Sequence, residues 1–205
     1  MGKSKAQIRQ NLFVLFELNL KRNSYFVEFG ATNGVDLSNT FLLEMDFKWS
    51  GILAEPARHW QEDSASNRNY SVKRLWEWKN SSDFIRFAET EIRKLSTIAL
   101  FSDSDKHSKS QKQKDVYEIE TISFNDLILK YDAPKSIDYL SIDTESSEFE
   151  ILKTVDFLNW NFRVITVEHN FSENSDKIFC LLPENGYKRK YEEKNYLLIN
   201  LEILW

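Results

Sequence analysis

The feature that most constrains the fold is a short apolar stretch that runs directly into two closely spaced glycines. Residues 26–29 (Phe-Val-Glu-Phe) have the pattern of a buried strand, and residues 30–34 (Gly-Ala-Thr-Asn-Gly) separate them from a helix that Ser38 can cap. The chain has only five glycines, so each is expected to have a positional reason. Such a turn lets the backbone approach a ligand closely, and ligands of open α/β sheets bind outside the carboxyl ends of the strands. The sequence therefore predicts a ligand-binding turn between Gly30 and Gly34.

Short apolar stretches alternate with helical patterns along most of the chain. Strands are expected at residues 24–29, 51–54, 70–76, 116–122, 137–142 and 163–167. Helices are expected at residues 7–20, 38–45, 57–68, 81–94, 125–131, 147–155 and 175–185. Gly186 stands where the last helix should end, and residues 187–191 and 196–203 should form a closing antiparallel hairpin. This alternation predicts an α/β fold with a mostly parallel central sheet covered on both faces.

The composition predicts one domain over residues 1–205. Hydrophobic residues make up 41% and charged residues 29% of the chain, which excludes disorder as its main state. The formal net charge is −5, and no nucleic-acid partner is expected because such a partner requires a basic face. The single cysteine, Cys180, excludes an internal disulfide. It fits a reducing compartment, so we expect a cytoplasmic protein.

Two further segments have a distinct character. The N-terminal segment, residues 1–22, contains an apolar stretch that Glu17 and Asn19 interrupt, which favours an amphipathic helix over a secretion signal. This helix would cover either the sheet or the partner in a homodimer. No apolar run approaches the ~20 residues that a membrane span requires. Residues 102–114 are nearly all polar and are expected to form a mobile loop.

An acidic residue follows the next predicted strand. Glu55 lies about 20 residues after Gly34, the spacing at which an acid can accept hydrogen bonds from ribose hydroxyls. The lysine of a P-loop and the third glycine of a dinucleotide fingerprint are both missing, and Glu28 and Asp36 disfavour a pyrophosphate. The pattern suits a ligand with an amino group and a ribose, such as S-adenosylmethionine. The alternative is an ordinary turn in which Glu55 caps the following helix.

Two more predicted strands end in acidic or imidazole side chains. Asp143 and Glu145 follow residues 137–142, and Glu168 and His169 follow residues 163–167. Together with Glu28, these groups would face one crevice, where crowded acids have raised pKa values or recruit a cation. Oxygen ligands suit Mg²⁺, so Asp143, Glu145 and His169 are candidate metal ligands. The alternative is that Asp143 caps a helix and that the other acids are solvated.

The ordered set of motifs resembles the FkbM-type methyltransferases. The resemblance rests on residues 26–34 (FVEFGATNG), 37–40 (LSNT), 51–56 (GILAEP), 137–145 (IDYLSIDTE) and 165–170 (ITVEHN). It implies a Rossmann-like methyltransferase fold, S-adenosylmethionine as the methyl donor, and usually O-methylation. The acceptor would then be a hydroxyl on a sugar, glycan or other small molecule.

The resemblance also implies roles for particular residues. Gly30, Ala31, Asn33 and Gly34 would line the amino-acid end of the donor, Glu55 would hold its ribose, and Asp143 would lie beside the transferred methyl group. The candidate catalytic residues are Asp143, His169 and Glu145. The full predicted cofactor-binding set is Glu28, Gly30, Ala31, Thr32, Asn33, Gly34, Ser38, Asn39, Glu55, Pro56 and Asp143.

The chain departs from the family pattern at three places. Ser146 stands where the family usually has glycine, residues 71–91 match poorly, and the tail of residues 192–205 lacks the acidic-aromatic motif found in related sequences. These departures leave open a second hypothesis, a catalytically impaired relative that binds S-adenosylmethionine or its product without turnover. A third hypothesis is a nucleotide-sugar enzyme built on a similar sheet.

Overall fold

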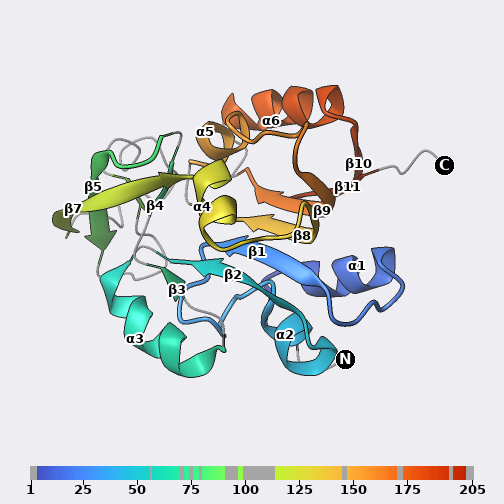
Figure 1. The fold of residues 1–205 in the computed structure, drawn as a ribbon, viewed down its shortest axis with the longest axis horizontal. Coiled ribbons are helices and arrows are strands. Elements are labelled where there is room, and N and C mark those ends of the chain that lie inside the picture. Colours follow the sequence, from blue (N-terminus) through green and yellow to red (C-terminus); the bar gives the residue numbers. More distant parts are fainter. Residues whose placement is uncertain are drawn as a thin grey trace.

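The computed structural model describes residues 4–55, 57–69, 72–73, 76–78, 80–90, 97–98, 114–144, 147–169, 173–193 and 196–201. Within these ranges, the chain forms two β-sheets flanked by helices (Figure 1). Residues 102–113 of the predicted polar loop lie outside the described residues. The predicted site residues Pro56 and Glu145, together with Ser146, lie outside them as well.

The larger sheet contains both the parallel core and the C-terminal hairpin that the sequence predicts. Its described strands are β1 (Tyr25–Phe29), β2 (Ser50–Ala54), β3 (Val72–Lys73), β8 (Ser136–Ile142), β9 (Asn161–Glu168), β10 (Tyr187–Glu193) and β11 (Tyr196–Leu201). Their order across the sheet is β10-β11-β9-β8-β1-β2-β3. Strands β3, β2, β1, β8 and β9 run parallel, whereas β11 is antiparallel to both β9 and β10. The predicted α/β, Rossmann-like class is confirmed.

Helices cover both faces of this sheet (Figure 1). They are α1 (Gln10–Glu17), α2 (Phe41–Phe47), α3 (Arg58–Asn67), α4 (Phe124–Lys130), α5 (Glu148–Leu152) and α6 (Glu173–Glu184). One core lies between the sheet and α4, α5 and α6, and includes Val27 and Phe29 of β1. The second lies between the sheet and α1 and α2, and includes Phe26. Burial on both faces explains why the central strands are nearly continuous apolar runs.

Helix α1 covers the sheet, which is the first of the two roles that the sequence left open for it. Its buried residues Val14 and Leu15 pack with Leu18 against the sheet, so the helix covers the sheet within its own chain. Among the helices in the described part of the chain, none has the length and apolar character needed to cross a bilayer. Gly186 lies two residues after the end of α6 and has a φ of 86°, as expected for a residue that ends a helix.

The smaller sheet overturns one predicted helix. Its described strands are β4 (Trp76–Trp78), β5 (Phe84–Thr90), β6 (Thr97–Ile98) and β7 (Lys114–Ser123), in the order β4-β7-β5-β6. The helix predicted at residues 81–94 is wrong, because residues 84–90 form a strand paired antiparallel with β7. The predicted strand at residues 70–76 is also divided, since β3 and β4 belong to different sheets.

The reason lies in how residues 84–87 are buried. The helical pattern would place Phe84 and Phe87 together on the buried face, yet Phe84 is 67% exposed and Phe87 is fully buried. Exposed Phe84 and Arg86 alternate with partly buried Ile85 and buried Phe87, the period of a strand. Phe87 packs with Ile119 of β7 in a small core of its own, so pairing with a distant strand decides the conformation.

Helix α2 offers a test of the second core. Leu43 is fully buried, whereas Met45 on the same helix is 41% exposed. Leu43→Ala should lower the free energy of unfolding by about 2–5 kcal/mol through the cavity it leaves, and Met45→Ala should change it by less than about 0.5 kcal/mol. Urea denaturation of the two variants checks this, and similar losses in both would contradict the assigned packing of α2.

Candidate functional site

Three parallel strands meet at Gly30. The residue has a φ of 79°, and a Cβ atom there would lie 1.8 Å from the backbone oxygen of Asp143. The amide of Gly30 donates to the carbonyl of Ala54 at 3.1 Å, and the amide of Asp143 donates to the carbonyl of Phe29 at 3.2 Å. The carboxyl ends of β1, β2 and β8 are therefore joined through backbone at a position that only glycine can occupy.

The turn after Gly30 holds its shape through its own polar groups. The Asn33 side-chain oxygen accepts from the amides of Val35 and Asp36, at 3.0 and 2.8 Å. The Thr32 hydroxyl donates to the carbonyl of Asp36 at 2.7 Å. Asn67 of α3 donates to the carbonyl of Asn33 at 2.9 Å. The turn is thus preorganised before any ligand arrives.

Glu28 lies beneath this turn on β1 and is 1% exposed. Its carboxylate accepts hydrogen bonds from the Ser38 hydroxyl at 2.9 Å and from the Asn39 amide at 2.6 Å, and also from the Thr40 hydroxyl. Burial raises the pKa of Glu28, although Arg68 and these hydrogen bonds act in the opposite direction. Three members of the predicted cofactor set, Glu28, Ser38 and Asn39, are therefore bonded to one another, and this carboxylate anchors the start of α2.

Arg68 also belongs to the site, although no sequence motif pointed to it. Its guanidinium donates to Glu44 of α2 at 2.6 Å, and both side chains are almost fully buried. It also donates to the carbonyl of Gly34 at 2.8 Å, to the Ser38 hydroxyl at 3.1 Å and to the Thr40 hydroxyl at 2.9 Å. Arg68 follows α3 in the chain, so only the tertiary fold brings it beneath the turn.

Glu55 joins the turn to the following helix. It is 6% exposed, and its two oxygens accept from the amides of Thr32 and Ala57, each at 2.9 Å. The pKa of Glu55 is raised from 4.5 to about 7. Burial is the main cause, the amide hydrogen bonds oppose it, and the neighbouring carboxylates of Asp143 and Glu28 add to the rise. The sequence offered ribose binding and helix capping as alternatives. The contact with Ala57 reaches the N-cap residue of α3, and that with Thr32 ties Glu55 to the glycine turn.

Asp143 stands beside these groups at the end of β8. Its backbone lies against Gly30, and its charge is close enough to act on Glu55. The next residue, Thr144, donates through its amide to Glu148 at 2.9 Å, and Glu148 is 4% exposed. Glu148 therefore holds Thr144 in place after β8, a role to which no motif in the sequence points.

His169 lies toward a different part of the sheet edge. It is 2% exposed, and its ring packs edge-on against Phe179 of α6 with centroids 5.5 Å apart. Within the described part of the chain, no group of three His, Cys, Asp or Glu residues could hold a metal ion. Glu145, the third predicted Mg²⁺ ligand, lies outside the described residues, so the described contacts lend the predicted metal site no support.

A buried polar row crosses the sheet on the face that α1 and α2 cover. The Asn39 amide group donates to the Ser141 hydroxyl of β8 at 2.9 Å. Thr166 of β9 lies 3.5 Å from Ser141, and its hydroxyl is 2.7 Å from that of Tyr139. The Asn39 side-chain oxygen, in a residue 3% exposed, has no hydrogen-bond partner among the described residues. A buried acceptor of this kind calls for a ligand or a water molecule.

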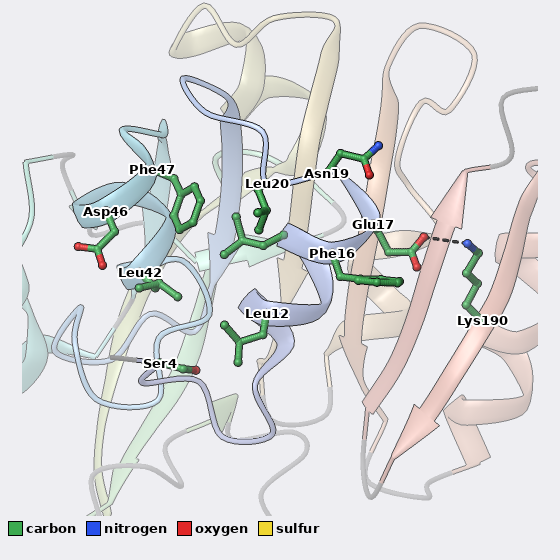
Figure 2. Close-up of a pocket in the computed structure, with 11 residues that line it drawn as sticks. Ser4, Leu12, Phe16, Glu17, Asn19, Leu20, Leu42, Asp46, Phe47 and Lys190 are labelled. Atoms are coloured by element: carbon green, nitrogen blue, oxygen red, sulfur yellow. Dashed lines mark hydrogen bonds and ion pairs between the residues drawn. The ribbon is translucent and has the colours of Figure 1, made fainter. Parts of the chain in front are cut away.

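A separate pocket of about 1070 Å³ lies between α1 and α2 (Figure 2). Its walls are largely apolar and include Leu12, Phe16 and Phe47. The ion pair of Glu17 and Lys190, 2.8 Å apart, stands at one side. Its lining residues include neither the glycine turn of residues 30–34 nor the carboxylates of Glu28, Glu55 and Asp143. The pocket is therefore distinct from the candidate site.

Two of the glycines with a left-handed backbone conformation, Gly30 and Gly186, allow a matched test. Gly30→Ala should destabilise the fold by well over about 1 kcal/mol, because it combines backbone strain with a collision against the Asp143 carbonyl. Gly186 has a similar φ of 86°, but among the described residues no atom lies within 4 Å of a Cβ placed there. Gly186→Ala should therefore cost only the strain, about 1–2 kcal/mol. Thermal unfolding compares them, and equal losses would argue against the close approach at Gly30.

Glu55 predicts a pH dependence of stability. Its pKa is raised on folding, so its contribution to stability is fully present below pH 4.5 and is lost as the pH rises through about 7. The stability of wild type relative to Glu55→Gln should therefore fall by roughly 3 kcal/mol across this window. Urea denaturation at several pH values measures the difference in unfolding free energy between the two proteins. The contribution of Glu28 largely cancels because both proteins contain it. A constant difference would contradict the assignment.

Comparison with known proteins adds the family. Among proteins with curated descriptions, none matches the chain significantly. Of the solved structures, a precorrin-6y C5,15-methyltransferase from Geobacter metallireducens is 13% identical, with 92% of this chain and 84% of that chain covered and a TM-score of 0.49. A putative RNA methyltransferase from Pyrococcus horikoshii is 10% identical, with 95% and 81% covered and a TM-score of 0.47. A SAM-dependent methyltransferase from Aquifex aeolicus is 10% identical, with 97% and 92% covered and a TM-score of 0.45.

Structural similarity to proteins that are only 10–13% identical says nothing about the substrate or the mechanism of this chain. The sequence itself is more informative, since the family profile of the methyltransferase FkbM domain matches residues 28–189. That stretch begins at Glu28, runs through the glycine turn, Glu55 and the ends of β8 and β9, and includes most of the chain. The chain therefore belongs to the FkbM methyltransferase family.

Proposed function

We propose that the protein transfers a methyl group from S-adenosylmethionine to a hydroxyl oxygen of a sugar or another small-molecule acceptor. The observation that carries this proposal is the junction at Gly30, where a glycine turn and the buried carboxylate of Glu55 meet at the carboxyl ends of three parallel strands. Membership of the FkbM family implies S-adenosylmethionine as the donor. The O-methylation and the acceptor class go beyond the family assignment and rest on the resemblance described above.

The described residues fit this donor in three respects. The turn at Gly30 has no side chain, so the backbone there can lie directly against a ligand. The unpartnered oxygen of Asn39 is a buried acceptor of the kind that an ammonium group satisfies. Glu55 has a second lone pair on each oxygen beyond its two amide contacts, so it can also accept from ribose hydroxyls.

The sulfonium compound supplies an activated methyl group when bound. The protein's task is then chiefly orientation, which can contribute about 7–11 kcal/mol to lowering a barrier. We assign Glu28, Ser38 and Arg68 to holding the turn rather than to contacting the donor, because their polar groups already bond to one another. Asn39 and Glu55 are the residues we assign to direct contact.

Proton removal from the acceptor falls to Asp143 in this proposal. It is partly exposed and adjoins the glycine turn, whereas His169 is buried against α6. A general base typically contributes about 10²–10⁴-fold, so replacing it would slow methyl transfer without abolishing donor binding. Glu145 and Pro56, which the resemblance also places at the site, lie outside the described residues.

Isothermal titration with S-adenosylmethionine tests the proposal. The wild-type protein should bind, and Glu55→Gln should weaken binding about tenfold or more because a charged acceptor for the ribose is lost. Glu62→Gln, which changes an exposed acid on the adjacent helix α3, is the matched control and should bind like wild type. An unchanged affinity in Glu55→Gln would remove Glu55 from the site.

The titration also separates the competing functions. Wild-type protein that fails to bind S-adenosylmethionine and its demethylated product would overturn the proposal. Binding without methyl transfer to a broad panel of hydroxyl acceptors would instead identify the impaired relative that Ser146 and the altered tail suggest. Thermal stabilisation by nucleotide sugars and not by S-adenosylmethionine would identify the third hypothesis.

A further inference from the structure

Two amide side chains are buried without complete hydrogen bonding at the start of α1. Gln10 and Asn11 are both 0% exposed. The Gln10 side-chain oxygen accepts from the amide of Ile8 at 3.1 Å, and that of Asn11 accepts from the Ser4 hydroxyl at 2.8 Å. Their nitrogen atoms, Nε2 and Nδ2, have no hydrogen-bond partner within the described part of the chain. Buried donors without partners are costly, so a group that satisfies them is expected.

The path of the N-terminal segment places these donors near the glycine turn. Ala6 pairs with Leu37 in a parallel bridge, which puts it beside the loop that follows the carboxyl end of β1. Lys21 bonds to Asp138 at 2.6 Å, near the start of β8 and so at the opposite edge of the sheet. Helix α1 therefore runs from the ligand-binding edge toward the other edge, alongside β1 (Figure 1). Its first turn, with Gln10, lies toward the edge that carries the turn.

The donors lie on the face of α1 that looks onto the sheet. Gln10 precedes Val14 by one helical turn and Asn11 precedes Leu15 by one turn, so each shares a face with a residue of the second core. Tyr139 belongs to that same core. Its hydroxyl begins the polar row that leads through β9 and β8 to Asn39.

This side of the sheet therefore holds two kinds of unsatisfied buried group. Gln10 and Asn11 each offer an N–H donor, and Asn39 offers a carbonyl acceptor. Arg68, a buried cation that could otherwise receive an anion, is already bonded to Glu44 and to three oxygens of the turn region. A ligand that complements the free groups carries an acceptor such as a carboxylate and a donor such as an ammonium group, as the amino-acid end of a molecule does.

We propose that the first turn of α1 completes the donor site, with the side chains of Gln10 and Asn11 binding the carboxylate of the amino-acid end of S-adenosylmethionine and Asn39 accepting from its ammonium group. This inference rests on the proposed function, because it assigns residues to the same ligand. It adds an element that precedes the matched family region, which begins at residue 28. It also gives α1 a binding role besides covering the sheet.

Apolar replacements of similar shape test the assignment. Gln10→Met and Asn11→Leu remove the N–H donors, and Gln7→Met is the matched control because it makes the same change at an exposed position just before the helix. Calorimetry compares S-adenosylmethionine with 5′-methylthioadenosine, which shares the adenosine but lacks the amino-acid end. We expect affinity for S-adenosylmethionine to fall about 10- to 100-fold in each site variant. Affinity for methylthioadenosine should stay within about twofold of wild type, and Gln7→Met should match wild type with both ligands.

The outcomes separate this inference from the proposed function. Site variants that bind S-adenosylmethionine as tightly as wild type, or that lose both ligands equally, overturn the role of α1 and leave the donor site standing. Wild-type protein that binds neither ligand overturns both proposals. Should an apolar replacement fail to fold, as judged by circular dichroism, Asn11→Asp at pH 8 keeps the shape and places a negative charge against the carboxylate. Asn11→Asp should lose affinity for S-adenosylmethionine and keep that for methylthioadenosine. Wild-type affinity for both ligands would refute the assignment.

Discussion

The structure depends on two buried side chains of opposite charge, Glu28 and Arg68, which are joined through hydroxyl groups and not by a direct contact. The hydroxyls of Ser38 and Thr40 lie between Glu28 and Arg68, accepting hydrogen bonds from the guanidinium and donating to the carboxylate. Glu44 completes the charge balance on the other side of Arg68. Removing one member would leave an uncompensated charge in the interior, which is far more costly than losing a surface ion pair. The network thereby fixes β1, the start of α2 and the end of α3 in one arrangement.

The site is a consequence of that arrangement. Glu28 and Arg68 both hold the turn from beneath, so its backbone at Gly30 can lie against that of Asp143, the residue after β8. Glu55 is then enclosed by its two amide donors and by the neighbouring Asp143, and burial shifts its pKa toward neutrality. A preorganised turn with a carboxylate held in place suits a ligand whose reactive group needs positioning more than activation. Our further proposal extends the site to α1, whose buried amides lie on the helix face that packs against the sheet.

Prediction from the sequence succeeded where a local rule and the tertiary fold agree. The strand before Gly30, the helix stop at Gly186 and the C-terminal hairpin follow from apolar runs and from backbone positions that favour glycine. It failed at residues 84–90, where the three-residue spacing of Phe84 and Phe87 fits one face of a helix, whereas the strand places the two side chains on opposite faces. Pairing with β7, some thirty residues further along the chain, decided that segment, and no local pattern carries such information. Arg68 was missed for a related reason, since its partners lie on other elements.

The sequence by itself determined the α/β class, the parallel core and the position of the glycine turn, because apolar periodicity and glycine placement are local properties of the chain. The tertiary structure alone decided which polar groups share the interior. It joined Arg68 to Glu44, placed His169 against α6 away from the polar row, and turned Gln10 and Asn11 inward. Such pairings depend on which elements pack together. The free-energy cost of burying a polar group depends on its neighbours in space, and these cannot be read from the order of residues in the chain.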